Sequence, residues 1–288
     1  MNKQLSLIAA ILMSFVFTLS AGAAELTFTA IPDQDTARLE QRFNKIADYL
    51  ARKLEIKVTY IPVKSYAASV EAFKNNQVQL AWFGGLSGVE ARQAVPGSQA
   101  IAQGAEDEHF VTYFIVNSET GLKPGSDFPA RIAGLTFTFG SKGSTSGRLM
   151  PEYYIRQYFK KSPREVFKRV GFSGDHTKTI ALVQAGSYQV GAVNFKVWEN
   201  EIKEGNIDSQ KISVIWQTPE YPDYNWTIRG DADKAFGAGF IKKVQTALVA
   251  MKDPDLLASF PRSAFIPADN ALYQPILDVG TEIGILRK

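Results

Sequence analysis

The chain has 288 residues and a mass of 31.8 kDa, which is enough for one large domain or two of ordinary size. Hydrophobic residues make up 45% and charged residues 21%, which excludes intrinsic disorder and a multi-span membrane protein. The net charge of +3 is too small for a general nucleic-acid binder, and the absence of cysteine removes thiolate metal sites, disulfides and cysteine nucleophiles. With only His109 and His176 left as imidazole ligands, we expect no metal and no cofactor.

Residues 1–24 have the pattern of a secretory signal peptide. Lys3 gives a positive start, an apolar stretch covers residues 5–19, and residues 21–23 fit the A-x-A cleavage pattern. We therefore expect cleavage after Ala23 or Ala24. The apolar stretch is shorter than the roughly 20 residues of a membrane anchor. Bacterial lipoproteins carry their lipid on a cysteine at the cleavage site, so this sequence predicts a periplasmic protein without a lipid anchor.

Strands and helices then alternate along the chain. In the first part we expect strands at 26–31, 58–63 and 79–83, with helices at about 35–54 and 65–75 between them. Repeated βα units of this kind predict a mainly parallel sheet with helices on its faces.

The pattern restarts in the middle of the chain, without a flexible linker. We expect two α/β lobes that share crossover strands: lobe 1 from residues 25–112 plus 218–288, lobe 2 from residues 113–217, and a ligand cleft between them. The remaining expected elements are strands at 113–116, 135–139, 190–194 and 212–217, and helices at about 151–160, 176–185, 232–251 and 253–258.

The segment 143–147, Gly-Ser-Thr-Ser-Gly, follows an expected strand and opens a helix. Ser144 is a good N-cap residue, and the N–H groups of the first helical turn have no acceptor within the helix. With the hydroxyls of Thr145 and Ser146 and the positive end of the helix dipole, this turn suits a phosphate-sized oxyanion. An ordinary capped helix has the same pattern. Pro151 predicts an offset between this turn and the helix that follows.

Two further segments place polar side chains at the ends of expected elements. His176 begins a helix, where it could donate to an anion or cap its own helix. The loop 218–226 is polar and aromatic, and could be a ligand contact or a surface turn. Lysine-rich stretches such as residues 160–161 are interpreted as solvated faces.

Four separated motifs resemble the substrate-binding proteins of phosphonate, phosphite and phosphate ABC importers, in order over about residues 26–266. Within that family the chain is most similar to the branch labelled selenate-binding. The four family motifs are residues 79–84, 144–147 followed by Pro151, 174–176 and 215–216, and the branch features are residues 31–35, 81–86 and 222–226.

The resemblance implies a type II periplasmic-binding-protein fold, in which two α/β lobes close on an oxyanion. It implies anion contacts from Ser144, Thr145 and Ser146, with Tyr66 reaching from the other lobe. It also places His176, Asp223 and a second group of cleft residues around the anion, namely Trp82, Gly84, Phe110, Asn194, Lys196 and Tyr224.

Two departures from the family pattern bear on the ligand. Lys196 stands where phosphonate binders carry a glutamate that grips an aminoalkyl group, and Phe110 replaces a tyrosine at the cleft entrance. A lysine repels an ammonium group, so a bare divalent anion is favoured.

Asp223 is the open position of the predicted site. Its carboxylate would repel fully deprotonated selenate or sulfate, whereas phosphate or phosphite could share a proton with it. It could instead bind His176 or Lys196, and Tyr224 could occupy its place if the loop is shifted by one residue.

These observations favour a periplasmic solute-binding component of an ABC importer, a monomer that delivers a small inorganic or organophosphorus oxyanion to a permease and ATPase and binds no nucleic acid. No catalytic residue is expected.

One alternative is an exported serine hydrolase using Ser144 or Ser146 with His176 and Asp223, although Thr145 breaks the G-x-S-x-G motif. Another is a sensor subunit that docks on a membrane receptor. Selenate, sulfate, phosphate, phosphite and phosphonates all remain open as the ligand.

Overall fold

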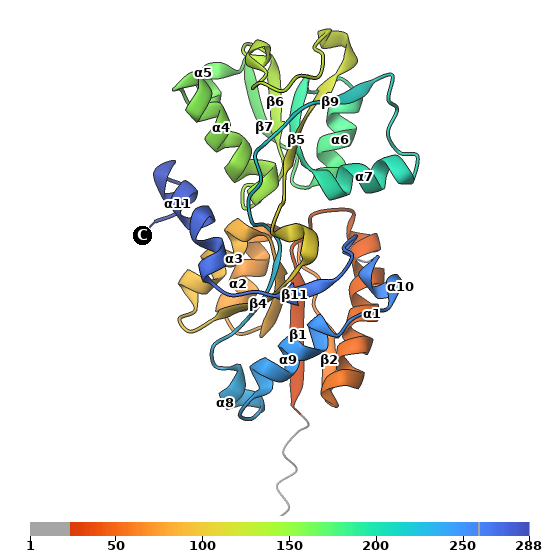
Figure 1. Cartoon of the computed structure of the whole chain (residues 1–288), viewed down its shortest axis with the longest axis vertical. Coiled ribbons are helices and arrows are strands. Elements are labelled where there is room, and N and C mark those ends of the chain that lie inside the picture. The colour runs from red at the N-terminus through yellow and green to blue at the C-terminus, as the bar shows by residue number, and fades with distance from the viewer. Residues whose placement is uncertain (1–23, 259, 288) are drawn as a thin grey trace, which may run out of the picture.

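The computed structural model describes residues 24–258 and 260–287, which form two α/β lobes, one above the other in Figure 1. Residues 1–23 of the expected signal peptide lie outside the described residues. None of the helices within the described ranges is both long and apolar enough to cross a bilayer.

The first lobe contains a six-stranded sheet in the order β11-β4-β10-β3-β1-β2. Helices α1, α2 and α3 connect its first strands, and α8 to α11 follow β10. The strands are β1 Glu25–Ala30, β2 Lys57–Tyr60, β3 Leu80–Phe83, β4 Gln99–Gly104, β10 Asn225–Ile228 and β11 Phe265–Pro267. The helices are α1 Thr36–Leu54, α2 Tyr66–Lys74, α3 Gly85–Ala94, α8 Ala232–Phe236, α9 Phe240–Val249, α10 Pro254–Leu257 and α11 Gln274–Glu282.

The second lobe contains a five-stranded sheet in the order β7-β6-β8-β5-β9. Its strands are β5 Thr112–Asn117, β6 Thr136–Phe139, β7 Arg169–Phe172, β8 Val190–Asn194 and β9 Ile212–Gln217. Its helices are α4 Met150–Phe159, α5 Pro163–Val166, α6 His176–Gln184 and α7 Phe195–Lys203.

The expectation of mainly parallel sheets is wrong, because both sheets are mixed. Strand β10 runs antiparallel to β3 and β4, and β5 runs antiparallel to β8 and β9. These are the two strands that the chain reaches by crossing from one lobe to the other. β5 and β10 both begin at the cleft and run away from it. The strands that lead into helices at the cleft run in the opposite direction, towards it.

The C-terminal part also differs from the expectation. The helix predicted at 232–251 is two helices, α8 and α9, separated where Gly237 and Gly239 adopt φ angles of 106° and 82°. Such positive φ angles are accessible to glycine but not to a continuing helix. The sequence analysis also missed several short or weakly patterned elements, namely α3, α5, α7, α11, β4, β7, β10 and β11.

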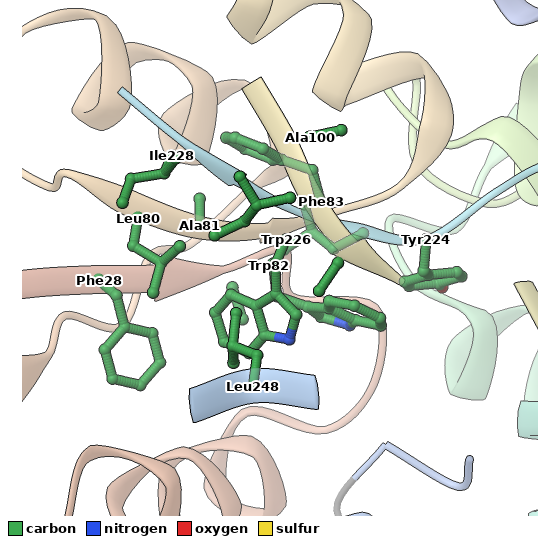
Figure 2. Close-up of a cluster of buried hydrophobic side chains, with 14 of the residues drawn as sticks. Phe28, Leu80, Ala81, Trp82, Phe83, Ala100, Tyr224, Trp226, Ile228 and Leu248 are labelled. Atoms are coloured by element: carbon green, nitrogen blue, oxygen red, sulfur yellow. The ribbon is translucent and has the colours of Figure 1, made fainter. Parts of the chain in front are cut away.

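An aromatic core packs against the sheet of the first lobe and extends to the cleft (Figure 2). The rings of Trp82 and Trp226 lie 5.5 Å apart between centroids, and Phe28 meets Trp226 at 5.7 Å. Trp82 also stacks on Tyr224 at 5.4 Å. Because Tyr224 directly follows Asp223, this buried packing fixes the segment that carries Asp223 just before the start of β10.

A buried ion pair holds the two crossing segments in register. Arg262 places two nitrogens within 3.0 Å of the Asp107 carboxylate, and both side chains are almost fully buried. The Asp107 carbonyl in turn accepts the N–H of Asp223 at 3.0 Å. A charge that is stripped of its partner in such a place is strongly destabilising.

We therefore expect Arg262→Met to lower the free energy of unfolding by about 3–5 kcal/mol, because it leaves Asp107 buried and unpaired. Chemical denaturation measures the loss. The matched control is Lys57→Met at the exposed Lys57–Glu25 pair, where no measurable loss is expected. Equal stability of the two variants would contradict this account of the ion pair.

Candidate anion-binding site

The turn after β6 is a tight, polar helix start. Ser144 caps it, and its Oγ accepts the Gly147 N–H at 2.9 Å. Residues Thr145–Leu149 form a π-helical turn, after which α4 begins with Pro151 in its first turn. The turn and the helix are therefore separate elements, as Pro151 predicted. In the first turn the N–H groups of Thr145 and Ser146 have no acceptor within the helix.

The hydroxyl oxygens of Ser144 and Thr145 each accept a hydrogen bond from a backbone N–H group. The Ser144 oxygen accepts from Gly147, and the Thr145 oxygen accepts the N–H of Leu86, in the other lobe, at 2.9 Å. A hydroxyl has one proton and two lone pairs, so accepting a bond leaves the proton available. All three hydroxyl side chains of the turn, including Ser146, are buried.

His176 adds a neutral donor beside this turn. Its Nδ1 accepts the backbone N–H of Asn194 at 3.3 Å, which places the ring proton on Nε2, 3.5 Å from the Ser146 hydroxyl oxygen. Full burial lowers the pKa of His176 to about 3, so the ring is uncharged near neutral pH. His176 can therefore donate one hydrogen bond without adding a positive charge.

Asp223 faces the turn from the second crossing segment. Its Oδ1 accepts the N–H of Gly85 at 2.8 Å, whereas its buried Oδ2 has no hydrogen-bond partner among the described residues. Burial raises the pKa of Asp223 to about 7, against the opposing effects of its hydrogen bonds and of Arg262. The carboxyl group is thus poised between its neutral and charged forms.

Tyr66, the first residue of α2, supplies the other unpartnered atom. Its side chain is 2% exposed, and its hydroxyl has no hydrogen-bond partner within the described part of the chain. Burial, together with the charge of Asp33 and to a lesser degree that of Asp223, raises the pKa of Tyr66 well above its usual value. Nearly every buried polar atom in a protein has a partner, so these two atoms beside a donor-rich turn are open to bond a ligand or a water molecule.

Tyr224 and Asn194 form a network next to the site. The Tyr224 hydroxyl donates to Asp33 at 2.8 Å and accepts from Asn194 at 2.9 Å. The Asn194 Oδ1 caps α7, so neither side chain is left with an obvious free group. Burial raises the pKa of Asp33 to about 6. The structure therefore leaves the vacant hydrogen-bonding position to Asp223 and not to Tyr224.

The other predicted cleft residues are apolar walls or lie outside the polar cluster. Trp82 stacks on Tyr224, and the fully buried Phe110 meets Phe195 edge-on at 4.8 Å. Lys196 pairs with Glu199 at 3.0 Å and lies over the Phe195 ring, both on its own helix. Lys196 also lines a small pocket together with Trp82, Asn194 and Tyr224, three of the other predicted cleft residues.

Gly84 allows the two lobes to approach each other. A Cβ atom at Gly84 would lie 3.2 Å from Oδ1 of Asp223 and 3.3 Å from Oγ1 of Thr145. The backbone N–H groups of Gly85 and Leu86, which bind these two side chains, were missed by the sequence analysis. The Gly84-Gly85 pair at the end of a buried strand was the available signal.

Further contacts between the lobes surround the site. The N–H of His176 donates to the Asp33 carbonyl at 3.0 Å, and Arg38 bonds both Glu201 and Glu204 at 3.2 and 2.6 Å. The polar cluster is therefore enclosed between two lobes that touch on both sides of it.

Two α/β lobes that close over a buried polar cluster define a solute-binding protein. The chain matches the family of periplasmic substrate-binding proteins of phosphonate ABC transporters over residues 28–273, and it belongs to that family. It is a periplasmic solute-binding protein of an ABC importer.

Individual relatives agree with this assignment. The chain is 37% identical to a protein from Prochlorococcus marinus (strain MIT 9301) described as a probable ABC transporter phosphite binding protein, PhnD1, over 99% of both chains. It is 28% identical to the phosphonates-binding periplasmic protein of Escherichia coli (strain K12), covering 68% of this chain and 58% of that protein. A structure of the Prochlorococcus PhnD1 in complex with methylphosphonate superposes with a TM-score of 0.86, at 39% identity over 91% of this chain and 99% of that one.

Gly84→Ala is expected to weaken ligand binding about tenfold. The new methyl group would be too close to Asp223 and Thr145, and such overpacking costs about 1–3 kcal/mol in the free energy of the closed form. Calorimetric titration with methylphosphonate measures the effect. Gly125→Ala is the matched control, since a Cβ there meets no atom within 4 Å. Unchanged binding by Gly84→Ala would show that the described lobe contact is not needed for binding.

Proposed function

We propose that this chain captures a small phosphorus oxyanion, such as phosphite or methylphosphonate, and delivers it to an ABC permease. The observation that carries the proposal is the pair of buried, unpartnered atoms, Oδ2 of Asp223 and Oη of Tyr66, beside the turn that begins at Ser144. A tetrahedral anion in this position would give both atoms a partner.

Each anion contact has a defined donor. The hydroxyls of Ser144, Thr145 and Ser146 would donate to the ligand, together with the first-turn N–H groups and the positive end of the turn's dipole. The Nε2–H of His176 and the hydroxyl of Tyr66 complete the donor set. No lysine or arginine is required in direct contact, because such a helix start binds an anion through hydrogen bonds and partial charges.

Asp223 selects the protonation state of the ligand. Because the pKa of Asp223 is raised to about 7, one proton can be shared between its Oδ2 and an oxygen of phosphite, phosphate or a phosphonate. Phosphate-type oxyanions have a second pKa near ~6 and match it closely. Selenate and sulfate carry no proton at neutral pH, so they would face Asp223 less favourably. We therefore rank selenate below the phosphorus oxyanions as the ligand of this protein.

The relatives support this choice through the ligands that their descriptions state. The Prochlorococcus protein is described as a phosphite-binding protein and has been solved with methylphosphonate. A chain from Mycolicibacterium smegmatis, at 25% identity, is described as a phosphate-import protein. All of these ligands are tetrahedral phosphorus oxyanions that can hold a proton near neutral pH.

The contacts of His176 disfavour the serine hydrolase alternative. A general base must accept the serine proton, but the Nδ1 of His176 already accepts from Asn194, so Nε2 carries the proton instead. Asp223 bonds Gly85 and has no bond to His176. The low pKa of His176 also makes it a weak base. The arrangement suits holding an anion and does not activate Ser146.

We further propose export by the predicted signal peptide, cleaved after Ala23 or Ala24, and action as a soluble periplasmic monomer without a lipid anchor. The partner would be a permease and ATPase complex of the inner membrane. Docking on a membrane sensor would use the same ligand chemistry. Genes for a permease and an ATPase beside this one would favour transport.

Thr145→Val is expected to weaken phosphite binding at least tenfold, because a hydrogen bond to a charged group contributes about 1.5–3 kcal/mol. Thr145→Ser keeps the hydroxyl and should bind within a few-fold of the parent. Calorimetry with phosphite, methylphosphonate, phosphate, sulfate and selenate gives both affinity and rank order. If Thr145→Val binds as tightly as the parent, the turn does not hold the anion; if no oxyanion binds at millimolar concentration, the proposed function is wrong.

The pH dependence tests the role of Asp223. Its pKa is raised by folding, so the stability contributed by the protonated carboxyl is lost as the pH rises through about 7. A divalent anion that binds above that pH must take up about one proton on binding, so its affinity should fall up to tenfold for each pH unit.

In Asp223→Asn the neutral amide should remove this fall in affinity, and Asp33→Asn, which alters the neighbouring network, should keep it. Calorimetric titrations with phosphite from pH ~7 to ~9 measure the slopes. Identical slopes in the parent and Asp223→Asn would contradict proton sharing.

A further inference from the structure

The second lobe carries a concentration of positive charge that the binding site does not use. Between Lys142 and Arg169 the sequence has eight lysines and arginines against two carboxylates, a net charge of +6. The rest of residues 25–288 has 23 basic and 27 acidic residues, a net charge of −4. The mild overall charge of the chain therefore conceals a strongly basic segment, which covers α4, α5 and β7 at the upper left of Figure 1.

Part of this segment surrounds a hollow on the surface. The hollow has a volume of about 460 Å³ and an aromatic floor that includes Phe172, which is 38% exposed. Lys142 and Arg148 both lie over the Phe172 ring, at 5.6 and 5.1 Å from its centroid. The cationic side chains that line the hollow are Lys142, Arg148, Arg156 and Arg164.

Only one carboxylate among the described residues that line this hollow offsets these charges. Glu152 is buried and bonds Arg148 and Arg156, at 2.7 and 2.6 Å. Lys142 and Arg164 are exposed, and neither pairs with a carboxylate of residues 24–258 or 260–287. A surface whose cations outnumber its carboxylates in this way attracts anions over a range set by the ionic strength.

The hollow continues into a groove that runs between the lobes. This groove, of about 390 Å³, shares Lys142 and Phe172 with the hollow and is also lined by residues of α2 and α3. Three of its residues directly precede anion-site segments in the chain: Ser65 precedes Tyr66, Gly143 precedes Ser144, and Gly174 precedes the Asp175 cap of α6. The groove therefore lies next to the segments that carry the candidate anion-site residues.

We propose that the basic surface formed by Lys142, Arg148, Arg156 and Arg164 is an electrostatic guide that draws the oxyanion along this groove into the cleft. The proposal rests on the proposed oxyanion function and adds a role that is separate from holding the ligand. Field lines from like charges converge where a low-dielectric cleft opens, and such focusing raises association rates by about 10- to 1000-fold. The guide acts on the rate of capture, and the hydroxyl turn determines the rate of release.

The groove also contains a carboxylate, whose negative charge would slow the approach of an anion. Its removal should therefore change the association rate in the opposite direction from removal of the cations. Glu90 of α3 is the one carboxylate among the described residues that line the groove, and it has no hydrogen-bonding or ionic partner there. Burial raises the pKa of Glu90 to about 7, so part of its repulsion towards an approaching anion remains near neutral pH.

The experiment measures association and dissociation rates of phosphite by stopped-flow tryptophan fluorescence, with affinities from calorimetry. The double variant Lys142→Glu/Arg164→Glu should lower the association rate about tenfold at ~0.01 M salt, and the difference should nearly vanish at ~1 M. The dissociation rate should not change. Lys142→Gln/Arg164→Gln should show a smaller loss, and Glu90→Gln should raise the association rate.

Lys53→Glu/Lys234→Glu is the matched control. It makes the same change in net charge on exposed residues of α1 and α8 in the first lobe, away from the basic surface, and should leave the association rate close to that of the parent. An equal fall in the association rate of this control would mean that net charge alone causes the effect, and it would overturn the proposal.

Other results also overturn it. If the parent binds phosphite and the Lys142→Glu/Arg164→Glu variant associates at the parental rate at every salt concentration, the surface does not guide the ligand. A faster dissociation with unchanged association would make these residues ligand contacts instead. Failure of the parent to bind any oxyanion would instead count against the proposed function, so the two failures are distinguishable.

Discussion

The proposed binding site is built around one buried carboxyl group, of which only one oxygen has a hydrogen-bond partner among the described residues. Asp223 lies just before the start of β10 between the lobes, where Gly85 fills one of its oxygens and nothing in the described chain fills the other. Burial without a cation in contact makes ionisation costly, so the group can accept a ligand that brings a proton. This constraint links the choice of ligand to its protonation state.

The surrounding structure holds that carboxyl group in place and encloses it. The Asp107–Arg262 pair fixes the first crossing segment, whose carbonyl binds the Asp223 backbone. The stacked rings of Trp82 and Tyr224 fix the next residue along. On the opposite lobe, Thr145 reaches the N–H of Leu86, and this contact brings the hydroxyl turn against α3. Closure of the lobes and completion of the site are therefore one event.

Much of this arrangement was predictable from local sequence. The Gly-Ser-Thr-Ser-Gly segment predicted the capped turn, and Pro151 predicted its separation from α4, because both depend on backbone chemistry within a few residues. The start of a helix at His176 was also predicted, as α6 shows. The choice between Asp223 and Tyr224 could not be made, because it depends on Asp33 and Asn194, which lie far away in the sequence.

Features that arise from tertiary contacts were missed or misread. The antiparallel direction of β5 and β10 comes from the path of the chain between the lobes, and no residue pattern within those strands records it. The pairing of Lys196 with Glu199, one turn away on the same helix, was not considered in the sequence analysis. The donors of Gly85 and Leu86 are backbone groups and leave only the Gly84-Gly85 pair as a trace in the sequence.

The central claim is that a protonatable oxyanion occupies the space between Asp223, Tyr66 and the Ser144–Ser146 turn. A crystal structure of the phosphite complex tests it most directly. The account predicts one phosphite oxygen at about 2.5–2.7 Å from Oδ2 of Asp223, as in a charge-assisted O–H···O bond, with a second oxygen bonded to the Tyr66 hydroxyl. A phosphite ion bound elsewhere, with both of these atoms still unpartnered, would contradict it.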